Sequence, residues 1–540
     1  MYIKKILIKN YKIFENLVFD VNKDFNIFVG ENDSGKSSIL EAIEILSTGK
    51  LNGCLFSKQI KANLFNYNVR REYIESLSDI KSLKIPPKII IEAYFESDEA
   101  EYQGSENELC DNCTGIRVNV EINQENSVIY KKLLIAGEIY DIPVELYTVS
   151  YHYFNGDPVA FRFGPLKTFF IDTTRKDYSN VVDRFVSENI TTYLNPQEQL
   201  DLSTAYRKCR NDFHQNEIVN SLNESVKKFV HIANKSLTLD LKEENSEEWK
   251  KQMSVVVDDI PFENIGFGSQ NTIKIELALK NSENQSNLVL MEEPENNLSF
   301  SNLSKLVQHV EESKGKQVFI TTHSSYVVNK LNLNNILLVN NGIVNSFSSI
   351  TPETVNYFRK LPGYNTLRII LSSKSILVEG PTDELIIQRA YKDEYNRLPS
   401  EDGVDIIVVD SLAFKRYCEI AELLHKKIII VTDNDSNIQK NINKKYSEYI
   451  DSEYVDFVYE TNECLNTIEP SVLEVNCIDG VPTEKFKLAI SKNNSQIDKS
   501  KSEILNYMLN NKTEWAIRVF DFEDKINYPE YIKNAIKKCR

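Results

Sequence analysis

The sequence predicts an α/β protein in which two α/β units follow one another along the chain. Near residue 30 a glycine-rich loop separates a short apolar strand from a helix. A second apolar strand, at 288–291, ends in paired carboxylates. A fresh alternation of apolar strands and helices then begins at Ser375. Strands that alternate with helices favour open, mostly parallel sheets, and the long interval between the first two features leaves room for an insert.

Length and composition restrict the class of protein. At roughly 150 residues per domain, 540 residues suggest about three to four domains. Lys and Arg number 63 against 79 Asp and Glu, which gives a net charge of −16, and 41% of the residues are hydrophobic. This apolar content excludes a disordered chain. The acidic balance argues against binding nucleic acid by bulk charge, although metal-binding carboxylates contribute negative charge themselves.

No part of the sequence indicates contact with a membrane. No apolar run reaches the ~18 residues that a membrane helix needs, and the basic N-terminal segment 1–10 alternates Lys with apolar residues as a strand does, unlike a signal peptide. We therefore expect a cytoplasmic protein. The eight cysteines include one close pair, Cys110 and Cys113. Because a zinc site needs four ligands and no second pair is near, we expect reduced turn cysteines.

Apolar alternation and short apolar runs predict the strands, and helical periodicity predicts the rest. The expected strands include Ile6 to Ile8, Leu17 to Phe19, 25–29, 88–95, 116–122, 130–135, 252–257, 288–291, 317–320, 375–378, 405–409 and 427–431. From 177 to 242 the pattern is helical and charged, as in an arm or a dimer contact. The expected domains are the first part of an α/β unit at 1–170, a helical insert suited to dimerisation at 171–250, the second part of the same unit at 251–345, a linker at 346–372 and a final domain at 373–540.

The loop after the third strand matches the phosphate-binding loop, because Gly30 and the run Gly35-Lys36-Ser37 have the required spacing between a strand and a helix. Backbone N–H groups of such a loop turn toward phosphates, and the helix N-terminus adds positive dipole character. Lys36 would reach the β- and γ-phosphates, and Ser37 would hold Mg²⁺. The candidate ATP contacts are Gly30, Asn32, Ser34, Gly35, Lys36, Ser37 and Ser38.

The strand at 288–291 ends in Glu292 and Glu293, which can complete the same nucleotide site. Glu292 fits a ligand of Mg²⁺, and Glu293 fits the residue that polarises the attacking water. The alternative is a strand that ends in a solvated acidic turn. The upstream phosphate-binding loop favours the functional interpretation.

Two further segments complete the set. A glycine turn precedes a helix expected from Thr272, and it offers backbone N–H groups to a γ-phosphate through Gly266, Gly268, Ser269 and Gln270. His323 ends the next apolar strand, where an imidazole could sense that phosphate. This order resembles ABC-type ATPases of the SMC and Rad50 kind. In that class the signature completes the site of a second subunit, so the resemblance implies a homodimer or a higher homo-oligomer.

The C-terminal unit carries a second set of acidic side chains. Glu379 closes an apolar strand, and Asp383 follows after a Gly-Pro turn. Asp433 and Asp435 close another strand, and residues i and i+2 of extended backbone project to the same side. Ligands gather at carboxyl ends of parallel strands, so these four residues are expected to bind Mg²⁺ or Mn²⁺. The alternative is a doubly wound domain with acidic loop ends.

This Glu-Gly and Asp-x-Asp pattern resembles the Toprim domain, which has a Rossmann-like fold. An ABC/SMC-like P-loop ATPase joined to a Toprim domain resembles the OLD (overcoming lysogenization defect) family of nucleases over essentially the whole chain. The resemblance implies a later acid at Glu469 and a basic residue at Lys512. One departure is Asn296 to Ser299, where relatives commonly have a histidine after the acidic pair.

The resemblance implies an ATP-binding, metal-dependent endonuclease acting on double-stranded DNA in bacterial defence against phage. Its partners would be a helicase-like protein, as in Gabija, or a reverse transcriptase with its RNA–DNA product, as in retrons. One alternative is an SMC/Rad50-like repair ATPase whose Toprim unit only binds, but 177–242 is too short for its heptad arms. The other is a primase or topoisomerase, whose zinc module or tyrosine domain is not evident.

Overall fold

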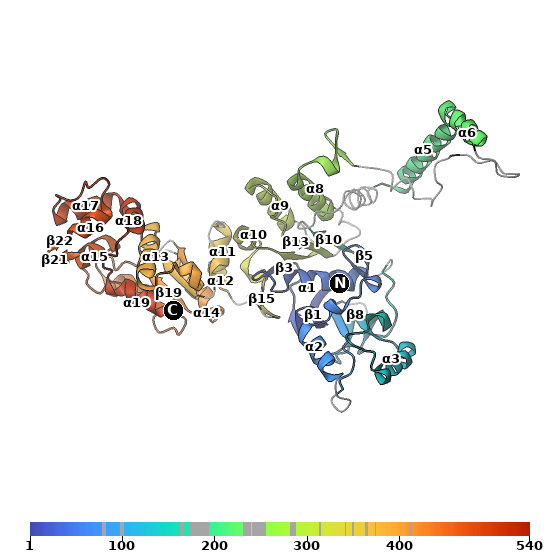
Figure 1. The fold of residues 1–540 in the computed structure, drawn as a ribbon, viewed down its shortest axis with the longest axis horizontal. Helices are drawn as coiled ribbons and strands as arrows, with labels where there is room; N and C mark the ends of the chain where they lie inside the picture. Colours follow the sequence, from blue (N-terminus) through green and yellow to red (C-terminus); the bar gives the residue numbers. More distant parts are fainter. Residues whose placement is uncertain are drawn as a thin grey trace. The chain divides into compact units, whose positions relative to one another are not determined.

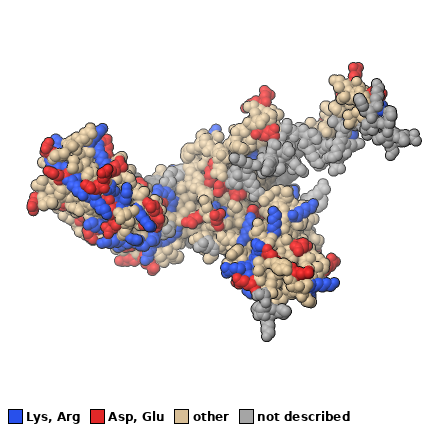
Figure 2. Space-filling model, in the orientation of Figure 1, with Lys and Arg blue, Asp and Glu red and all other residues tan. Residues whose placement is uncertain are grey.

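The computed structural model divides the chain into two compact units, which we describe separately (Figure 1). The first comprises Met1–Thr322 with Leu337–Asn345, and the second comprises His323–Ile336 with Ser346–Arg540. Acidic and basic side chains are interspersed over the visible face (Figure 2). The structure describes residues 1–77, 83–97, 102–161, 166–172, 194–229, 239, 255–280, 288–312, 315–340, 342–347, 350–361, 366–372, 374–409 and 413–540.

The first unit contains an antiparallel sheet in the order β2-β1-β6-β8-β7, with β9 paired to β8. The strands predicted at Ile6 to Ile8, Leu17 to Phe19, 88–95 and 116–122 are all present, and in the central strand β6 every residue except Glu96 is buried. The strands are β1 (Tyr2–Tyr11), β2 (Phe14–Asp20), β6 (Ile89–Glu96), β7 (Gln103–Gly104), β8 (Cys113–Ile122) and β9 (Tyr147–Tyr153).

The second sheet of this unit has the order β10-β13-β14-β3-β15-β16, and β10, β13, β14 and β3 run parallel. Every residue of β13 and β14 is buried, which explains why these strands read as continuous apolar runs. The strands are β3 (Phe25–Val29), β10 (Thr168–Asp172), β13 (Leu288–Glu292), β14 (Gln317–Thr321), β15 (Ile336–Asn340) and β16 (Ile343–Ser346).

Helix α1 (Lys36–Thr48) contacts strands of both sheets and joins them through one core. Its apolar residues Ile39, Leu40, Ile43 and Leu46 are fully buried. The helix that follows the phosphate-binding loop is therefore fixed on both sides. The other α-helices among the described residues of this unit are α2 (Tyr67–Ser76), α3 (Gln124–Ala136), α5 (Pro196–His214), α6 (Glu217–Phe229), α8 (Phe267–Lys280) and α9 (Phe300–Glu312). Short two-stranded pairs are β4 (Lys50–Leu51) with β5 (Cys54–Leu55) and β11 (Val256–Val257) with β12 (Ile260–Pro261).

The strand expected at 130–135 is wrong, because this segment lies in α3. The Asn123 side chain accepts a hydrogen bond from the N–H of Asn126 and begins the helix, and Gly137 ends it in the left-handed conformation. Only Tyr130 of this helix is buried. Local capping therefore decided the structure of a segment whose apolar residues suggested a strand.

The predicted helical insert contains α5 and α6, which contact each other (Figure 1). The α5 helix begins with Asn195 and Glu198, whose side chains each bond the other's backbone N–H, and with a proline in its first turn. Other parts of the insert, and residues 252–254 of the strand expected at 252–257, lie outside the described residues.

The second unit contains a four-stranded parallel sheet in the order β18-β17-β19-β20. Its strands are β17 (Lys374–Val378), β18 (Val404–Val408), β19 (Ile428–Val431) and β20 (Val455–Val458). The helices that follow β17 along the chain include α13 (Pro381–Tyr395), α14 (Phe414–Leu423), η8 (Gln439–Lys444, a π-helix), α15 (Ile468–Val475), α16 (Glu484–Ile490), α17 (Lys501–Asn510), α18 (Lys512–Asp521) and α19 (Glu530–Lys538). A short pair of strands joins β21 (Cys477–Ile478) to β22 (Val481–Pro482).

Residues 346–372, expected to be a linker, instead carry α11 (Pro352–Lys360) and α12 (Thr366–Leu371) and belong to the second unit. Their apolar side chains, such as Phe358 and Ile369, are fully buried. Both helices contact α10 (Ser325–Lys330), and the Thr366 hydroxyl donates to Asn329 Oδ1 at 2.6 Å. Amphipathic helices that bury one face form part of a domain, not a connection between domains.

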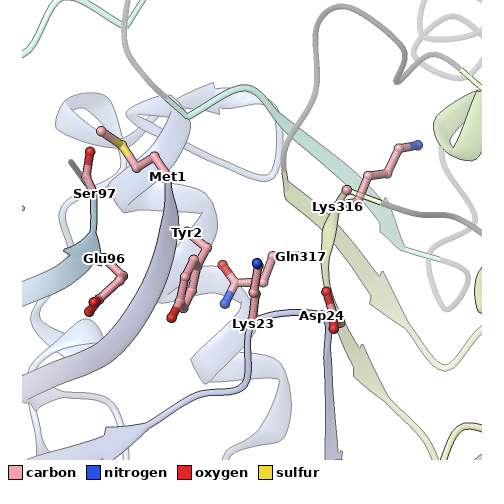
Figure 3. A pocket seen from close by; sticks show the side chains of 9 residues that line it. Met1, Tyr2, Lys23, Asp24, Glu96, Ser97, Lys316 and Gln317 are labelled. Carbon is pink, nitrogen blue, oxygen red and sulfur yellow. The ribbon is translucent and has the colours of Figure 1, made fainter. Parts of the chain in front are cut away.

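A cavity of about 340 Å³ opens at the amino ends of β3 and β14, lined by residues that include Tyr2, Lys23, Asp24 and Gln317 (Figure 3). The phosphate-binding loop follows the carboxyl end of β3, so this cavity lies at the opposite edge of the sheet. The described residues include no helix that is both long enough and apolar enough to cross a membrane.

Candidate functional site

The phosphate-binding loop has the backbone that its two glycines require. Gly35 precedes α1 with a φ of 105°, which is the left-handed region that favours glycine. A Cβ at Gly35 would lie 2.6 Å from Cζ of Phe14, and a Cβ at Gly30 would overlap the carbonyl oxygen of Val339. Both positions therefore admit glycine alone without a shift of the surrounding chain.

Lys36 lies inside this loop, where its side chain is 6% exposed. Its ammonium donates to the carbonyl oxygens of Gly30 at 2.9 Å and Glu31 at 2.8 Å. Burial lowers the pKa of Lys36, and the nearby carboxylates of Glu293 and Glu292 oppose this by favouring the charged form. The lysine of the loop therefore lies within the electrostatic field of the acidic pair.

The loop also carries an orphaned polar group. The Ser34 hydroxyl is buried and has no hydrogen-bond partner among the described residues. Asn32 and Ser37 are exposed at the same loop, and Ser38 is half-buried. Phosphate oxygens would supply acceptors to the hydroxyls and to Lys36, so the residues present fit a bound nucleotide.

The acidic pair ends β13, next to β14 in the parallel sheet. Glu292 is buried and lies opposite Thr321. The backbone N–H of Glu293 donates to the carbonyl oxygen of Thr321 at 2.9 Å, and Glu293 has a φ of 44°. Asn296 donates to Glu293 Oε2 at 2.9 Å, so the residue at the departure from the family pattern contacts the candidate water-polarising carboxylate directly.

The signature segment lies at the start of α8. The helix begins at Phe267, not at Thr272, so Gly268 and Ser269 lie in its first turn. A Cβ at Gly268 would overlap the carbonyl oxygen of Asn297, which places the segment against the turn after the acidic pair of the same chain. Gly266 and Ser269 are exposed.

Gln270 of the signature segment and His323 are placed differently from Gly266 and Ser269, the exposed residues at the start of α8. Gln270 is buried and donates to the carbonyl oxygens of Glu263 at 3.3 Å and Ile265 at 3.0 Å, so its amide points into its own chain. His323 follows β14 by two residues and belongs to the second unit. Its predicted role as a phosphate sensor stays a prediction.

The second site lies at the carboxyl ends of β17 and β19, which are adjacent and parallel. Glu379 follows β17, and its Oε1 accepts hydrogen bonds from the Thr432 hydroxyl and from the N–H of Asp433 at 3.1 Å. Asp383, in the first turn of α13, accepts from the N–H of Gly380 at 3.1 Å. Two loops far apart in sequence therefore place their carboxylates together.

Glu469 and Lys512 join this site from the helical part of the unit. Glu469 lies in the first turn of α15 with 1% of its surface exposed, and it accepts from the Thr467 hydroxyl at 2.7 Å. The Lys512 ammonium, at the first residue of α18, lies 3.9 Å from Glu469 Oε1, and the Lys512 side chain is 58% exposed. The two assignments that rested on short motifs thus meet in space.

The carboxylates act on one another electrostatically. Burial raises the pKa of Asp433 to about 8, with Asp383, Glu379, Glu469 and Asp435 adding to the effect. Burial, then Glu379 and Glu469, raise the pKa of Asp383 to about 7. Like charges that share a site disfavour ionisation, which is the direction expected for a cluster that a cation would neutralise.

The geometry of the cluster is open. Within the described parts of the chain, no three Asp, Glu, His or Cys side chains are arranged so that they could already hold one metal ion. Asp435 is exposed, with a φ of 47°, and its N–H donates to the carbonyl oxygen of Asn466 at 3.3 Å. Carboxylate oxygens are the donors that Mg²⁺ and Mn²⁺ take, so the residues fit such ions by chemistry.

Sequence reasoning missed the polar residues that hold these carboxylates. Thr432 and Thr467 donate to Glu379 and Glu469, and Asn434 lies buried between the two aspartates. The partners that Thr432 and the Asn434 amide nitrogen bond lie 26 or more residues away, so the sequence carried no signal for those contacts, whereas Thr467 bonds Glu469 two residues later. Adjacency to an acidic residue was the single local hint.

Comparisons with known proteins place both halves of the chain. Residues 1–195 and 152–328 match the family described as AAA ATPase domain, and residues 370–435 match the family described as overcoming lysogenization defect protein-like, TOPRIM domain. Similar curated proteins are the DNA replication and repair protein RecF of Clostridium botulinum (strain Eklund 17B / Type B), 32% identical over 87 residues, and that of Clostridium acetobutylicum, 34% identical over 89 residues. These matches cover 15% and 16% of this chain, which spans 22% and 24% of the two relatives.

Similar solved structures include the SmcHead bound to the C-winged helix domain of ScpA, at 16% identity and a TM-score of 0.33. Another is the recombination mediator protein RecF–ATP, at 14% identity and a TM-score of 0.35. They cover 65% and 64% of this chain, and 99% of each of those chains is covered. With an AAA ATPase domain over most of its first half and an OLD-like TOPRIM domain after it, the chain belongs to the OLD family of ATPase–Toprim proteins.

Proposed function

We propose that this protein is an ATP-binding, divalent-metal-dependent DNA endonuclease of the OLD type, that nucleotide regulates it, and that it serves as an effector of antiphage defence. The observation that carries the proposal is the gathering of Glu379, Asp383, Asp433 and Glu469 near the carboxyl ends of two parallel strands, where burial and neighbouring carboxylates raise the pKa values of the two aspartates. Asp435 lies at the exposed side of this cluster. A chain whose Toprim unit only bound DNA would have no need of so costly a cluster.

Divalent ions at this cluster would lower the pKa of a bound water and stabilise the leaving oxygen of a phosphodiester. The side chains of the cluster would bind these ions and orient the phosphodiester. Asp433 and Asp383 would exchange their protons for cation contacts, because a cation reverses the field that raises their pKa values. Lys512, half-exposed beside Glu469, is placed to neutralise a phosphate oxygen.

The nuclease assignment is tested with Asp435→Ala, because Asp435 is exposed and its removal leaves the core of the unit intact. Supercoiled plasmid is incubated with the full chain in Mg²⁺ or Mn²⁺, and we expect the variant to lose nicking and linear cleavage. The matched control is Asp498→Ala, an exposed aspartate in a loop of the same unit. Cleavage by Asp435→Ala at the wild-type rate would refute the assignment. Loss of phage protection in cells by the same variant tests the defence role.

For the nucleotide site, we propose that Lys36, Ser37 and Glu292 hold ATP and its Mg²⁺, and that Glu293 polarises the attacking water. Lys36→Ala should abolish ATP binding, since it removes the charge that faces the β- and γ-phosphates. Glu293→Gln should bind ATP but fail to hydrolyse it, because an amide is a poor base. Hydrolysis by Glu293→Gln at the wild-type rate would mean that the acidic pair is wrongly assigned.

We propose a homodimer in which the exposed start of α8, at Gly266 and Ser269, completes the nucleotide site of a second copy. Its first-turn N–H groups are suited to a γ-phosphate. The helical insert at 171–250 is our choice for a permanent contact, since Ile218 and Leu222 of α6 are exposed apolar side chains. Light scattering that gave a monomer at micromolar concentration, with and without ATP, would contradict this.

A further inference from the structure

The middle residue of the Asp-x-Asp loop is one of the most buried polar side chains of the second unit. Asn434 is 1% exposed. Its Nδ2 donates to the carbonyl oxygens of Glu460 at 2.8 Å and Asn462 at 3.1 Å, and its Oδ1 accepts from the N–H of Ser436 at 2.9 Å. An asparagine amide has two N–H donors and one carbonyl acceptor, so each of these groups is engaged.

These bonds connect the two acidic segments of the candidate nuclease site. The acceptors at 460–462 lie on the stretch of chain that leads to Glu469, and the N–H of Asp435 donates to Asn466 on the same stretch. The loop that carries Asp433 and Asp435 is therefore hydrogen-bonded to the segment that leads to Glu469. The two segments bring carboxylates of the same charge sign together, Asp433 and Asp435 on one segment and Glu469 on the other, and like charges that share a site repel each other.

The same side chain also supports a strained turn. Asp435 and Ser436 have φ values of 47° and 60°, in the left-handed region. Such a conformation is unfavourable for a non-glycine residue and persists where the surroundings hold it. The bond from the N–H of Ser436 to Asn434 Oδ1 closes this turn, and Asn441 Nδ2 adds a bond of 3.3 Å to the carbonyl oxygen of Asp435.

We propose that Asn434 is a positioning residue that fastens the Asp-x-Asp loop to the segment before Glu469 and thereby sets the spacing of the carboxylates that take a divalent cation. The proposal rests on the proposed nuclease function. Without the two bonds from Nδ2, repulsion among the carboxylates would separate the segments. A cation would then have to restore the spacing at the expense of its own binding energy, and its affinity would fall.

Two substitutions separate this role from a general effect on folding. Asn434→Asp keeps an oxygen for the N–H of Ser436, but it sets a second oxygen against the carbonyls of Glu460 and Asn462. Asn434→Ala removes the whole amide. The matched control is Asn443→Asp, which adds the same negative charge to η8. The Asn443 amide donates to Gln439 Oε1 at 2.8 Å, and this bond does not involve the Asp-x-Asp loop.

The test uses the full chain and Mn²⁺ as the probe, with binding followed by electron paramagnetic resonance and titration calorimetry. We expect Mn²⁺ affinity to fall about 10- to 100-fold in both Asn434 variants, the range found for partners that orient metal ligands. The Asn443→Asp control should bind Mn²⁺ within a few-fold of wild type. Plasmid cleavage should need more Mn²⁺ in the Asn434 variants and should recover most of its maximal rate at saturation.

A second measurement needs no metal. In EDTA, amide hydrogen exchange of residues 460–466 should speed up in the Asn434 variants while the amides of β17 and β19 stay protected. Faster exchange over the whole unit would indicate a purely structural role and overturn the proposal. Unchanged Mn²⁺ affinity and unchanged exchange would also overturn it. If instead wild type bound no Mn²⁺ that depends on Asp435, the proposed nuclease function itself would fail.

Discussion

Replacing Asp433 by Asn should stabilise the metal-free protein at neutral pH while it removes nuclease activity. Burial and the neighbouring carboxylates raise the pKa of Asp433 from its ordinary value of 3.8 to about 8. The folded state therefore holds a proton at Asp433 that the unfolded chain releases, so the free energy of unfolding falls as the pH rises from about 4 to about 8. An asparagine amide is neutral throughout and avoids this loss.

The size of the effect follows from the same shift. At 1.36 kcal/mol per pKa unit the whole shift corresponds to roughly 6 kcal/mol. The pKa of Asp383 is raised by the same field, so the two groups share the repulsion and their effects do not add. We expect Asp433→Asn to gain about 2–4 kcal/mol at pH 8, which is about 5–15 °C in the melting temperature of a unit of this size. At pH 4.5 the gain should be small.

The assay follows unfolding of the second unit by the fluorescence of Trp515, which is fully buried there. The chain has two tryptophans, so Trp249→Phe gives a background in which Trp515 alone reports. Unfolding by urea is measured in EDTA at pH 4.5 and pH 8, with Asp498→Asn as the control. Saturating Mn²⁺ should stabilise the wild type and should stabilise Asp433→Asn much less. Equal or lower stability of Asp433→Asn at pH 8 in EDTA would refute the reasoning.

Two further predictions concern the ATPase half. Gly30→Ala should lose ATP binding, measured with a fluorescent nucleotide, because the added Cβ overlaps the carbonyl oxygen of Val339 and lies 2.6 Å from the Ser34 hydroxyl; wild-type affinity would show that the loop can shift. Asn296→Ala should lower the kcat of ATP hydrolysis about tenfold with little change in KM, since it removes the hydrogen bond that orients Glu293. The control is Asn302→Ala, a half-buried site on α9, and an equal fall of kcat in this control would contradict a specific role for Asn296.

The sequence by itself determined the features whose signal is local. The phosphate-binding loop needs glycines at fixed spacing between a strand and a helix, and Gly30 and Gly35 occupy the tight positions that this spacing predicts. The sequence also predicted the acidic residues at the ends of β13, β17 and β19, because buried parallel strands appear as continuous apolar runs whose ends are easily located. The order of these motifs was sufficient to identify the fold class and the family, and the matches to both domain families confirm them.

Local signals also misled where two of them competed. The apolar residues at 130–135 suggested a strand, while Asn123 and Gly137 at the ends of α3 favoured a helix, and the caps prevailed. Residues 346–372 suggested a linker because the stretch holds turn residues and a helical pattern that looked exposed. The tertiary structure covers those residues with α10 and gives α11 and α12 a buried face.

Only the tertiary structure decided which side chains meet. Lys512 lies 3.9 Å from Glu469, and Asn434 is bonded to residues 460 and 462. Each pair depends on how segments distant in sequence pack against one another in the second unit, and such packing leaves no periodic trace in the sequence. The raised pKa values of Asp383 and Asp433 likewise arise from burial and from neighbouring carboxylates such as Glu379 and Glu469, which come together only in the folded unit.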